Sequence, residues 1–320
     1  MFRIVWAALV SALPALPLLA AVAADGYPQR PIRFIVPFSP GGATEVLARA
    51  LSDKLAEALG ASVIIDTRPG AGSTIGVGVV AKADPDGYTL LFTSASYAFV
   101  PSIYKDLPYD AVRDFKPITM IGSVPNLLVV HPSMPVTNLK QLLALARARP
   151  GDIFYASAGR GSNLHLTTEL FLYMARVNML HVPYKGGGPA MIALISGEVH
   201  VMLPGMQSAL PFVRSGMMRA LAVSTRKRAP ALPDLPTIDE SGVPGYDKAI
   251  WIGLFAPAAV PEPIISYVYN AVARVLKDPE VVRRLASEGA VAVSTPPAEF
   301  NAFVRAEIAT WAKLIRDMKL

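Results

Sequence analysis

Short apolar runs alternate with amphipathic stretches of helical period along this chain, and that alternation most constrains its fold. Residues 32–38, 63–65 and 88–92 have the composition of strands. Between the first two lies a stretch at 46–59 whose apolar residues recur every three or four positions, the period of one helix face. A further helical stretch follows the turn at 68–70. Strands that alternate with helices in this way favour a parallel sheet covered by helices.

The same rhythm resumes in the middle of the chain and predicts a second α/β lobe. There we expect helices at 139–148 and 166–175 and strands at 153–156, 179–182 and 199–203. The apolar residues 118–131 predict a first strand that crosses between the lobes, and the return crossing is expected between 220 and 257. From residue 261 onward helices dominate, at 264–276, 280–285 and 297–318. Two crossings make a hinge possible.

These elements divide the chain into two lobes, the first of which is discontinuous. We expect lobe 1 to comprise residues 25–124 and 251–320, and lobe 2 to comprise residues 125–250. Each lobe is expected to hold a mixed, mostly parallel sheet flanked by helices. The length left after a signal peptide, residues 25–320, suggests two lobes rather than one, and the 52% hydrophobic content supplies a buried core.

The first 24 residues predict a signal peptide that is removed on export. Arg3 supplies the positive start, residues 4–24 carry no charge, and small residues before Asp25 suit cleavage near Ala23 or Ala24. The alternative, an uncleaved anchor, is disfavoured because Pro14 and Pro17 interrupt the apolar run. With no cysteine in the chain, neither a lipid anchor nor a disulfide is available. We therefore expect a free protein in the periplasm.

The charge of the chain excludes one large class of partner. Thirty basic residues against 24 acidic ones give a net charge of +6, and the longest basic cluster is residues 226–228. Nucleic-acid readers carry a basic stripe with interleaved aromatic residues, which this chain lacks. We expect no nucleic-acid partner. The mild positive balance is compatible with an anionic ligand.

A glycine-rich turn after the first strand is the first candidate binding site. It places backbone N–H groups at the start of a helix, where unpaired donors and the positive end of the helix dipole favour an anion such as a carboxylate. The candidate residues here are Phe38, Ser39, Gly41, Gly42, Ala43 and Thr44, joined by Thr93 and Ser94 at the end of the third strand. An ordinary strand-to-helix turn is the alternative.

The second lobe has a similar arrangement of strand, small-residue loop and helix start. A small-residue loop at 157–162 leads into a helix, and its candidate ligand-binding residues are Ser157, Gly159, Gly161 and Ser162. His165 lies just inside that helix and either contacts ligand or packs at the helix start. Tyr184 and Lys185 precede three glycines at the end of another strand. Lys185 either pairs with an anion or faces solvent.

Catalytic and cofactor signatures are weak or missing. The stretch 70–76 departs from a dinucleotide-binding fingerprint in its last glycine, and there is no nucleophile elbow, phosphate loop or cysteine nucleophile. The four histidines show no helical metal-ligand spacing. We expect no enzyme, no cofactor and no metal.

Several short motifs occur in one order and together resemble a known family. They are residues 31–38 (PIRFIVPF), 68–72 (RPGAG), 85–91 (PDGYTLL), 155–159 (YASAG), 181–186 (HVPYKG) and 231–237 (ALPDLPT). This pattern resembles the Bug family of tripartite tricarboxylate transporter solute receptors, over essentially the whole mature chain. It implies a two-lobed periplasmic binding protein of type II-like fold that captures a small organic acid in the cleft between its lobes. The resemblance further implies delivery to membrane transporter subunits, and we expect a monomer.

The resemblance implies ligand contacts on both lobes, and the chain departs from the family pattern at some of them. The segment after the strand at 199–203 carries Pro204, Gly205 and Met206 where an acidic pair is common, and Arg160 stands where asparagine is frequent. Met206 joins the candidate site on this ground. Loss of the acid predicts a ligand without a free amine, since a buried unpaired ammonium is costly. Whether Arg160 holds a second carboxylate or faces solvent stays open, and so do an exported enzyme and a sensor for a membrane kinase.

Overall fold

Two mixed sheets form the frame of the protein, and the computed structural model describes residues 26–287, 289–318 and 320. The predicted signal peptide lies outside these residues. The first sheet has the order β11-β4-β10-β3-β1-β2. Its strands are β1 (Ile32–Val36), β2 (Val63–Thr67), β3 (Thr89–Ser94), β4 (Phe115–Pro125), β10 (Ala249–Pro257) and β11 (Val291–Ala292). Helices α1 (Ala43–Leu59), α2 (Thr74–Ala81), α3 (Ser96–Ile103), α8 (Glu262–Lys277), α9 (Pro279–Ser287) and α10 (Pro297–Met318) belong to this half.

The second sheet has the order β7-β6-β8-β5-β9. Its strands are β5 (Leu127–Val130), β6 (Phe154–Ser157), β7 (Leu180–Pro183), β8 (Val201–Met202) and β9 (Arg219–Val223). Helices α4 (Leu139–Ala148), α5 (Asn163–Ala175), α6 (Gly187–Ile195) and α7 (Met206–Arg214) flank it. The two-lobed α/β fold is therefore confirmed. Among the named strands, β1–β2, β1–β3, β6–β7 and β6–β8 pair parallel and the other pairs are antiparallel, so neither sheet is mostly parallel as expected. The reason is that the crossing strands pair antiparallel with their neighbours.

Capping residues mark the ends of helices that the sequence predicts. Asn138 accepts a hydrogen bond from the Gln141 N–H at 3.0 Å and so caps α4 at its predicted start. Gly60 ends α1 with φ of 69°, a left-handed conformation in which its N–H bonds to carbonyls of the last turn. These local signals make the bounds readable from sequence.

Three of the helices, α3, α6 and α7, were not predicted from the hydrophobic periodicity of the sequence. Pro101 lies inside α3, Pro211 lies inside α7, and α6 begins with two glycines and a proline. Such residues lower helix propensity, so these segments are helical because their apolar residues pack into the tertiary core. Sequence periodicity missed them for that reason.

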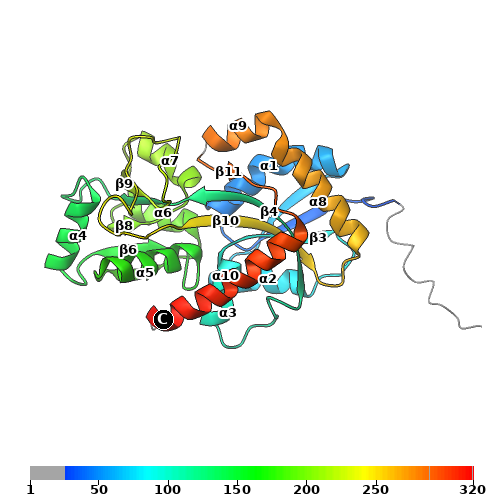
Figure 1. The fold of residues 1–320 in the computed structure, drawn as a ribbon, viewed down its shortest axis with the longest axis horizontal. Coiled ribbons are helices and arrows are strands. Elements are labelled where there is room, and N and C mark those ends of the chain that lie inside the picture. Colours follow the sequence, from blue (N-terminus) through cyan, green and yellow to red (C-terminus); the bar gives the residue numbers. More distant parts are fainter. Residues whose placement is uncertain (1–25, 288, 319) are drawn as a thin grey trace, which may run out of the picture.

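The predicted single crossing strand at 118–131 is wrong in one respect: it is two strands in two different sheets. β4 and β10 run side by side between the halves of the molecule (Figure 1), and the chain passes from β4 into β5 at Asn126. Asn126 donates its backbone N–H to Ser224 Oγ at 2.8 Å and its side-chain amide to the Leu203 carbonyl at 2.7 Å. Both strands are apolar and buried, so hydropathy alone could not show the break.

Ser224 ties the two crossings together. Its N–H donates to the Asn126 carbonyl at 2.9 Å, and its hydroxyl donates to the Lys248 carbonyl just before β10. The Lys248 N–H returns a bond to the Ser224 carbonyl at 2.9 Å. Asn126 and Ser224 are both 0% exposed. We call Asn126, Ser224 and Lys248 the hinge clasp, and we propose that the lobes divide at these crossings, close to the predicted boundaries 124/125 and 250/251.

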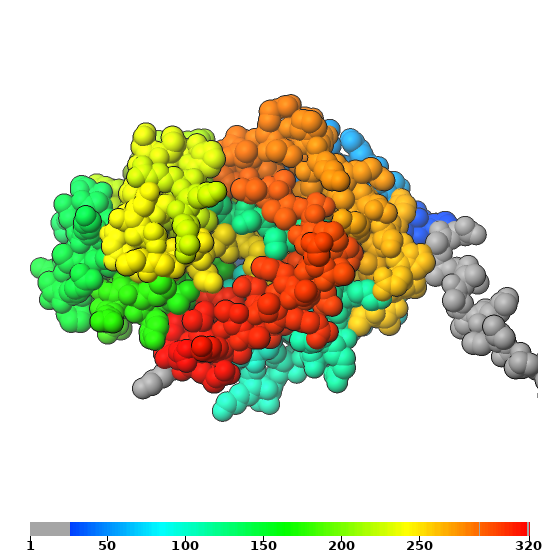
Figure 2. All heavy atoms as spheres, in the orientation of Figure 1, coloured from blue at the N-terminus to red at the C-terminus, as the bar shows by residue number. Residues whose placement is uncertain are grey.

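A third contact joins the halves at the C-terminal end of the chain. Helix α10 packs on α3 and β4 of the first half, and its end reaches α5 of the second half. Figure 2 shows this helix, in red, lying against the green surface of the second half. None of the helices in the described part of the chain combines the length and apolar composition needed to cross a membrane.

Replacing the buried clasp hydroxyl should destabilise the whole protein. Ser224→Ala leaves the Asn126 N–H and the Lys248 carbonyl each short of a partner, so we expect the free energy of unfolding to fall by about 1–3 kcal/mol. Urea denaturation measures this. Ser215→Ala is the control, because that exposed hydroxyl bonds only to a carbonyl of its own helix. Equal midpoints for the two variants would contradict the role of the clasp.

Candidate functional site

Three helices begin at one small cavity between the two halves. We call it the inner cavity; its volume is about 30 Å³. Gly42, Ala43 and Thr44 line it at the start of α1, Ser162, Asn163 and Leu164 at the start of α5, and Gly187 at the start of α6. Neither Gly42 nor Gly186, the residues that precede α1 and α6, supplies a side-chain cap. Backbone donors of three helices therefore converge on one space.

This convergence makes the inner cavity suited to an anion. The first N–H groups of a helix have no acceptor within the helix, and the aligned peptide dipoles add positive potential there. The rest of the lining is apolar or hydroxylic, from Phe38, Ser94, Ala158 and Ile250, and no charged side chain belongs to it. A carboxylate can accept several backbone hydrogen bonds in such a place without a cationic partner.

Asn163 is the polar residue at this cavity that the predicted site did not include; Ala158, Leu164, Gly187 and Ile250 also line it and were not predicted. Asn163 is 3% exposed, and neither its amide nitrogen nor its amide oxygen has a hydrogen-bond partner among the described residues. Its backbone N–H donates to Ser96 Oγ of the other half at 2.9 Å. A buried amide without partners is costly, so a free amide that lines a cavity points to a ligand. The available signal was its place immediately after the Ser162 cap of α5.

The two halves touch through glycines beside the inner cavity. A Cβ at Gly188 would lie 2.4 Å from the Pro40 carbonyl oxygen, and one at Gly186 would lie 2.4 Å from Ser39 Oγ. Ser39 Oγ also donates to the Lys185 carbonyl, and the Gln207 side-chain amide donates to the Ala43 carbonyl. The cavity holds no more than a water molecule or two, so an organic ligand enters only when these contacts separate.

A larger hollow adjoins the inner cavity. We call it the outer chamber; its volume is about 280 Å³, and it is lined from both halves, including Phe38 and Ala158, which it shares with the inner cavity. The predicted site residues Ser39, Gly159 and Tyr184 line this chamber. The predicted residues Phe38, Gly42, Ala43, Thr44, Ser94 and Ser162 line the inner cavity.

Two predicted residues of the first half lie close to the inner cavity without lining it. Gly41 donates its N–H to Glu45 Oε2 at 3.1 Å, so in this structure that donor is already used. Glu45 is buried and paired with Arg49, which balances its charge at the start of α1. Thr93 is fully buried and its hydroxyl oxygen has no partner among the described residues.

Four predicted residues of the second half line neither space: Ser157, Gly161, His165 and Met206. Met206 is 0% exposed and its side chain packs against Gly289 of the first half. Gly161 lies against the Tyr104 ring. As ligand contacts, these four stay predictions.

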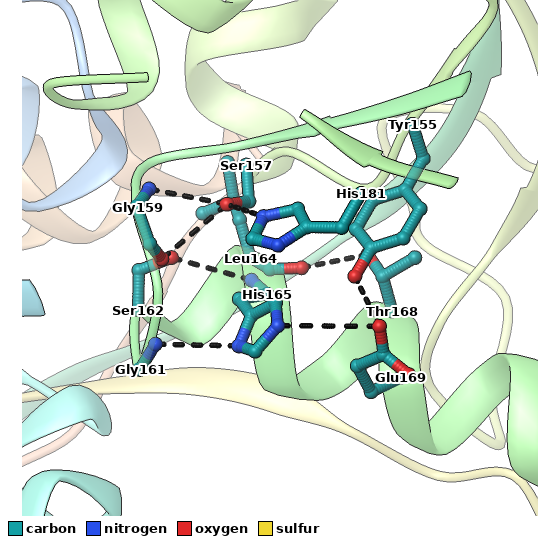
Figure 3. A network of polar contacts seen from close by, with 10 residues as sticks. All are labelled: Tyr155, Ser157, Gly159, Gly161, Ser162, Leu164, His165, Thr168, Glu169 and His181. Atoms are coloured by element: carbon teal, nitrogen blue, oxygen red, sulfur yellow. Dashed lines mark hydrogen bonds and ion pairs between the residues drawn. The ribbon is translucent and has the colours of Figure 1, made fainter. Parts of the chain in front are cut away.

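Ser157 and His165 belong to a polar network directly behind the second-half loop (Figure 3). His165 accepts the Gly161 N–H at 3.2 Å and stacks on His181 with ring centroids 4.2 Å apart. His181 Nε2 lies 2.6 Å from Ser157 Oγ, which in turn accepts the Gly159 N–H at 3.1 Å. The network therefore fixes the shape of the loop that forms one wall of the site.

Both histidines of this network are held neutral. Burial, together with the neighbouring His181 and Arg160, lowers the pKa of His165 to about 3. Burial and Arg160 lower the pKa of His181 to about 4. Glu169 lies 3.9 Å from His165 Nε2 and bonds to Tyr155, and burial raises the pKa of its carboxyl group. Protonating either ring would put charge into this packed cluster.

Stability should fall as the solution becomes acidic, because of these two rings. Between pH 6.5, the ordinary pKa of histidine, and about pH 4, these two side chains bind protons in the unfolded chain but not in the folded chain. The free energy of unfolding therefore decreases as the pH is lowered through that window. We expect His181→Gln to reduce this dependence, as measured by urea unfolding between about pH 7 and about pH 5. His131→Gln, outside the network, is the control. An unchanged pH dependence in His181→Gln would contradict the assignment.

Comparison with known proteins gives relatives over nearly the whole chain. Protein BugT of Bordetella pertussis is 38% identical over 300 residues, which cover 93% of this chain and 92% of BugT. A solved R. palustris protein with bound adipate is 38% identical with a TM-score of 0.89, covering 92% of this chain and 98% of that one. MatC from Rhodopseudomonas palustris, solved with bound malate, is 32% identical with a TM-score of 0.86, over 90% of this chain and 100% of MatC.

The family itself is recognised from the sequence profile of its members. The profile described as "Tripartite tricarboxylate transporter family receptor" matches residues 47–320. That span includes most of α1, all of the second half and the C-terminal helices. Together with the long relatives above, it shows that this chain belongs to the receptor family of the tripartite tricarboxylate transporters.

Proposed function

We propose that the protein is a periplasmic receptor that captures a small organic carboxylate and delivers it to the membrane subunits of a tripartite tricarboxylate-type transporter. One observation carries the proposal: the starts of α1, α5 and α6 meet the unpartnered Asn163 amide at a single small cavity between the lobes. Backbone N–H groups at the helix starts donate to the oxygen atoms of the ligand carboxylate, and the Asn163 amide nitrogen adds a donor from the second lobe.

The residues that line the site favour a ligand that is an acid without a free amino group. No aspartate or glutamate lines the inner cavity or the outer chamber. An ammonium group buried there would lack an anionic partner and would cost several kcal/mol. The apolar side chains of Phe38, Leu164 and Ile250 suit a hydrocarbon portion next to the carboxylate.

The relatives support the ligand class and the compartment. Two of the solved relatives hold adipate and malate, both small carboxylates, at TM-scores of 0.89 and 0.86 to this chain. Members of this family are solute-binding receptors, and we assign no reaction to the site. Cleavage near Ala23 or Ala24 and a monomeric state remain predictions from sequence.

Changing Asn163 should weaken carboxylate binding without unfolding the protein. Calorimetric titration of adipate, malate and hexanoate should give about tenfold weaker binding for Asn163→Ala, which loses a hydrogen bond to a charged group. Asn163→Asp should bind more weakly still, because its carboxylate repels the ligand. Asn178→Ala is the control, since that asparagine is exposed on the same half. Mass spectrometry of natively purified protein identifies any retained acid.

Two results would count against the proposal. Wild-type affinity in Asn163→Asp would show that the carboxylate lies elsewhere. Failure of the native protein to retain or bind any carboxylic acid would reject the receptor function itself.

Closure of the lobes should depend on the absence of a side chain at Gly188. Its Cβ would lie 2.4 Å from the Pro40 carbonyl oxygen, a contact that exists only when the halves touch. Gly188→Ala should therefore weaken binding of the best acid by at least about tenfold, while alanine in a helix leaves stability unchanged or higher. Small-angle scattering with saturating acid should show a smaller radius of gyration for wild type only. An equal decrease in the variant would contradict this.

A further inference from the structure

Each of the three helices that begin at the inner cavity is held near its start by a side chain from the opposite half. The start of α1, in the first half, is held by Gln207 of the second half. The start of α5 and the turn into α6, in the second half, are held by Ser96 and Ser39 of the first half. These hydrogen bonds join side chains of one half to the backbone of the other. Neither half can therefore arrange the three helix starts by itself.

Ser96 holds α5 at its first residue. The Ser96 hydroxyl oxygen accepts the Asn163 N–H at 2.9 Å, and Ser96 is 0% exposed. Helix α3, which begins at Ser96, packs against α5. Asn163 is the residue whose side-chain amide lines the inner cavity without a partner among the described residues. Ser96 thus fixes the backbone that carries the amide we assign to the ligand.

Gln207 holds α1 from the other side of the contact. Its amide nitrogen donates to the carbonyl of Ala43, the first residue of α1, and α7 packs against α1. A Cβ at Gly205 would lie 2.6 Å from Ala43 Cβ, so the glycine before α7 lets the two helices approach this closely. Gln207 is 5% exposed, and its amide oxygen has no partner among the described residues. That buried acceptor offsets part of the gain from the bond, so the contact alone stabilises closure weakly.

Ser39 holds the turn that leads into α6. Its hydroxyl donates to the carbonyl of Lys185, and the next residue, Gly186, precedes α6. Ser39 is 8% exposed. A serine hydroxyl has one hydrogen to donate, and this bond uses it. In this arrangement Ser39 therefore acts on the second half and has no hydrogen left to donate to a ligand.

We propose that Ser39, Ser96 and Gln207 are positioning residues, which assemble the three helix starts into one carboxylate site when the halves meet. This rests on the proposed function. Each of the three bonds exists only while the halves are in contact, so these bonds and the ligand stabilise the same closed state. A site whose donors are already in place binds its ligand at a lower cost in ordering.

Loss of one of these bonds should speed release of the ligand. We expect Ser96→Ala, Ser39→Ala and Gln207→Leu each to raise the dissociation rate constant of adipate about tenfold, with less than about threefold change in the association rate constant. Hexanoate should show the same ratio, because every carboxylate meets the same helix starts. Stopped-flow fluorescence of the tryptophans measures both rates.

Two exposed residues provide matched controls for these variants. Ser196→Ala removes a hydroxyl that bonds only within its own helix, and Gln29→Leu changes an exposed glutamine of the first half. Neither control should alter the rates.

The stability of the ligand-free protein separates positioning from a structural role. When the halves are apart, the three side chains face water, so Ser96→Ala and Gln207→Leu should leave the urea midpoint of the ligand-free protein unchanged. Ser224→Ala in the hinge clasp is the comparison, because it is expected to lower that midpoint. A lower midpoint with an unchanged release rate in the Ser96 and Gln207 variants would show that these residues are only structural.

A double-mutant cycle tests whether the residues act together. Ser96→Ala combined with Gln207→Leu should weaken adipate binding by less than the product of the two single effects, because the first loss already leaves the site partly unassembled. Effects that simply multiply would show two independent contacts and would overturn the shared assembly.

The outcomes separate this inference from the proposed function. If the three single variants keep the wild-type affinity and release rate for both acids, the positioning role is rejected while carboxylate capture stands. A liganded structure in which Ser96 Oγ or the Gln207 amide bonds to the acid itself would also overturn the inference. If the wild type binds no carboxylic acid, the proposed function fails first.

Discussion

The meeting of the starts of α1, α5 and α6 at the inner cavity is the constraint on which the proposed site depends. One of these helices belongs to the first half and two belong to the second, so their ends meet only when the halves are in contact. Positive ends brought together repel one another, and they lose water as the cavity closes. An anion that accepts from all three removes both costs, which couples closure to binding.

Glycines at the contact between the halves leave room for the halves to approach closely. Glycines at 186–188 meet residues 39–42 backbone to backbone, so the halves approach more closely than side chains would allow. The hinge clasp holds the two crossings together with buried hydrogen bonds. Two crossings held at one clasp and a contact surface of glycines are the features that the predicted hinge motion requires.

The two spaces between the halves differ in the kind of chemistry they offer. The inner cavity is uncharged apart from helix ends, whereas the outer chamber carries Arg160 and Lys185 together with Ser73. The neutral histidines behind the loop at 157–162 add no charge to either space at neutral pH. The two spaces therefore present different electrostatic environments to a ligand.

By itself, the sequence determined the features that depend on neighbouring residues. The helices at 139–148 and 297–318 were predicted with their final bounds, because caps and a 3.6-residue period are local signals. The glycine turns after β1 and β6 were likewise predicted to lead into helices, because a strand-turn-helix unit is a local pattern. Only the tertiary structure decided that 118–131 breaks at Asn126, that α3, α6 and α7 are helical, and that Asn163 is left without a partner. Each of these depends on which distant groups come into contact, and a pattern along the chain carries no information about that.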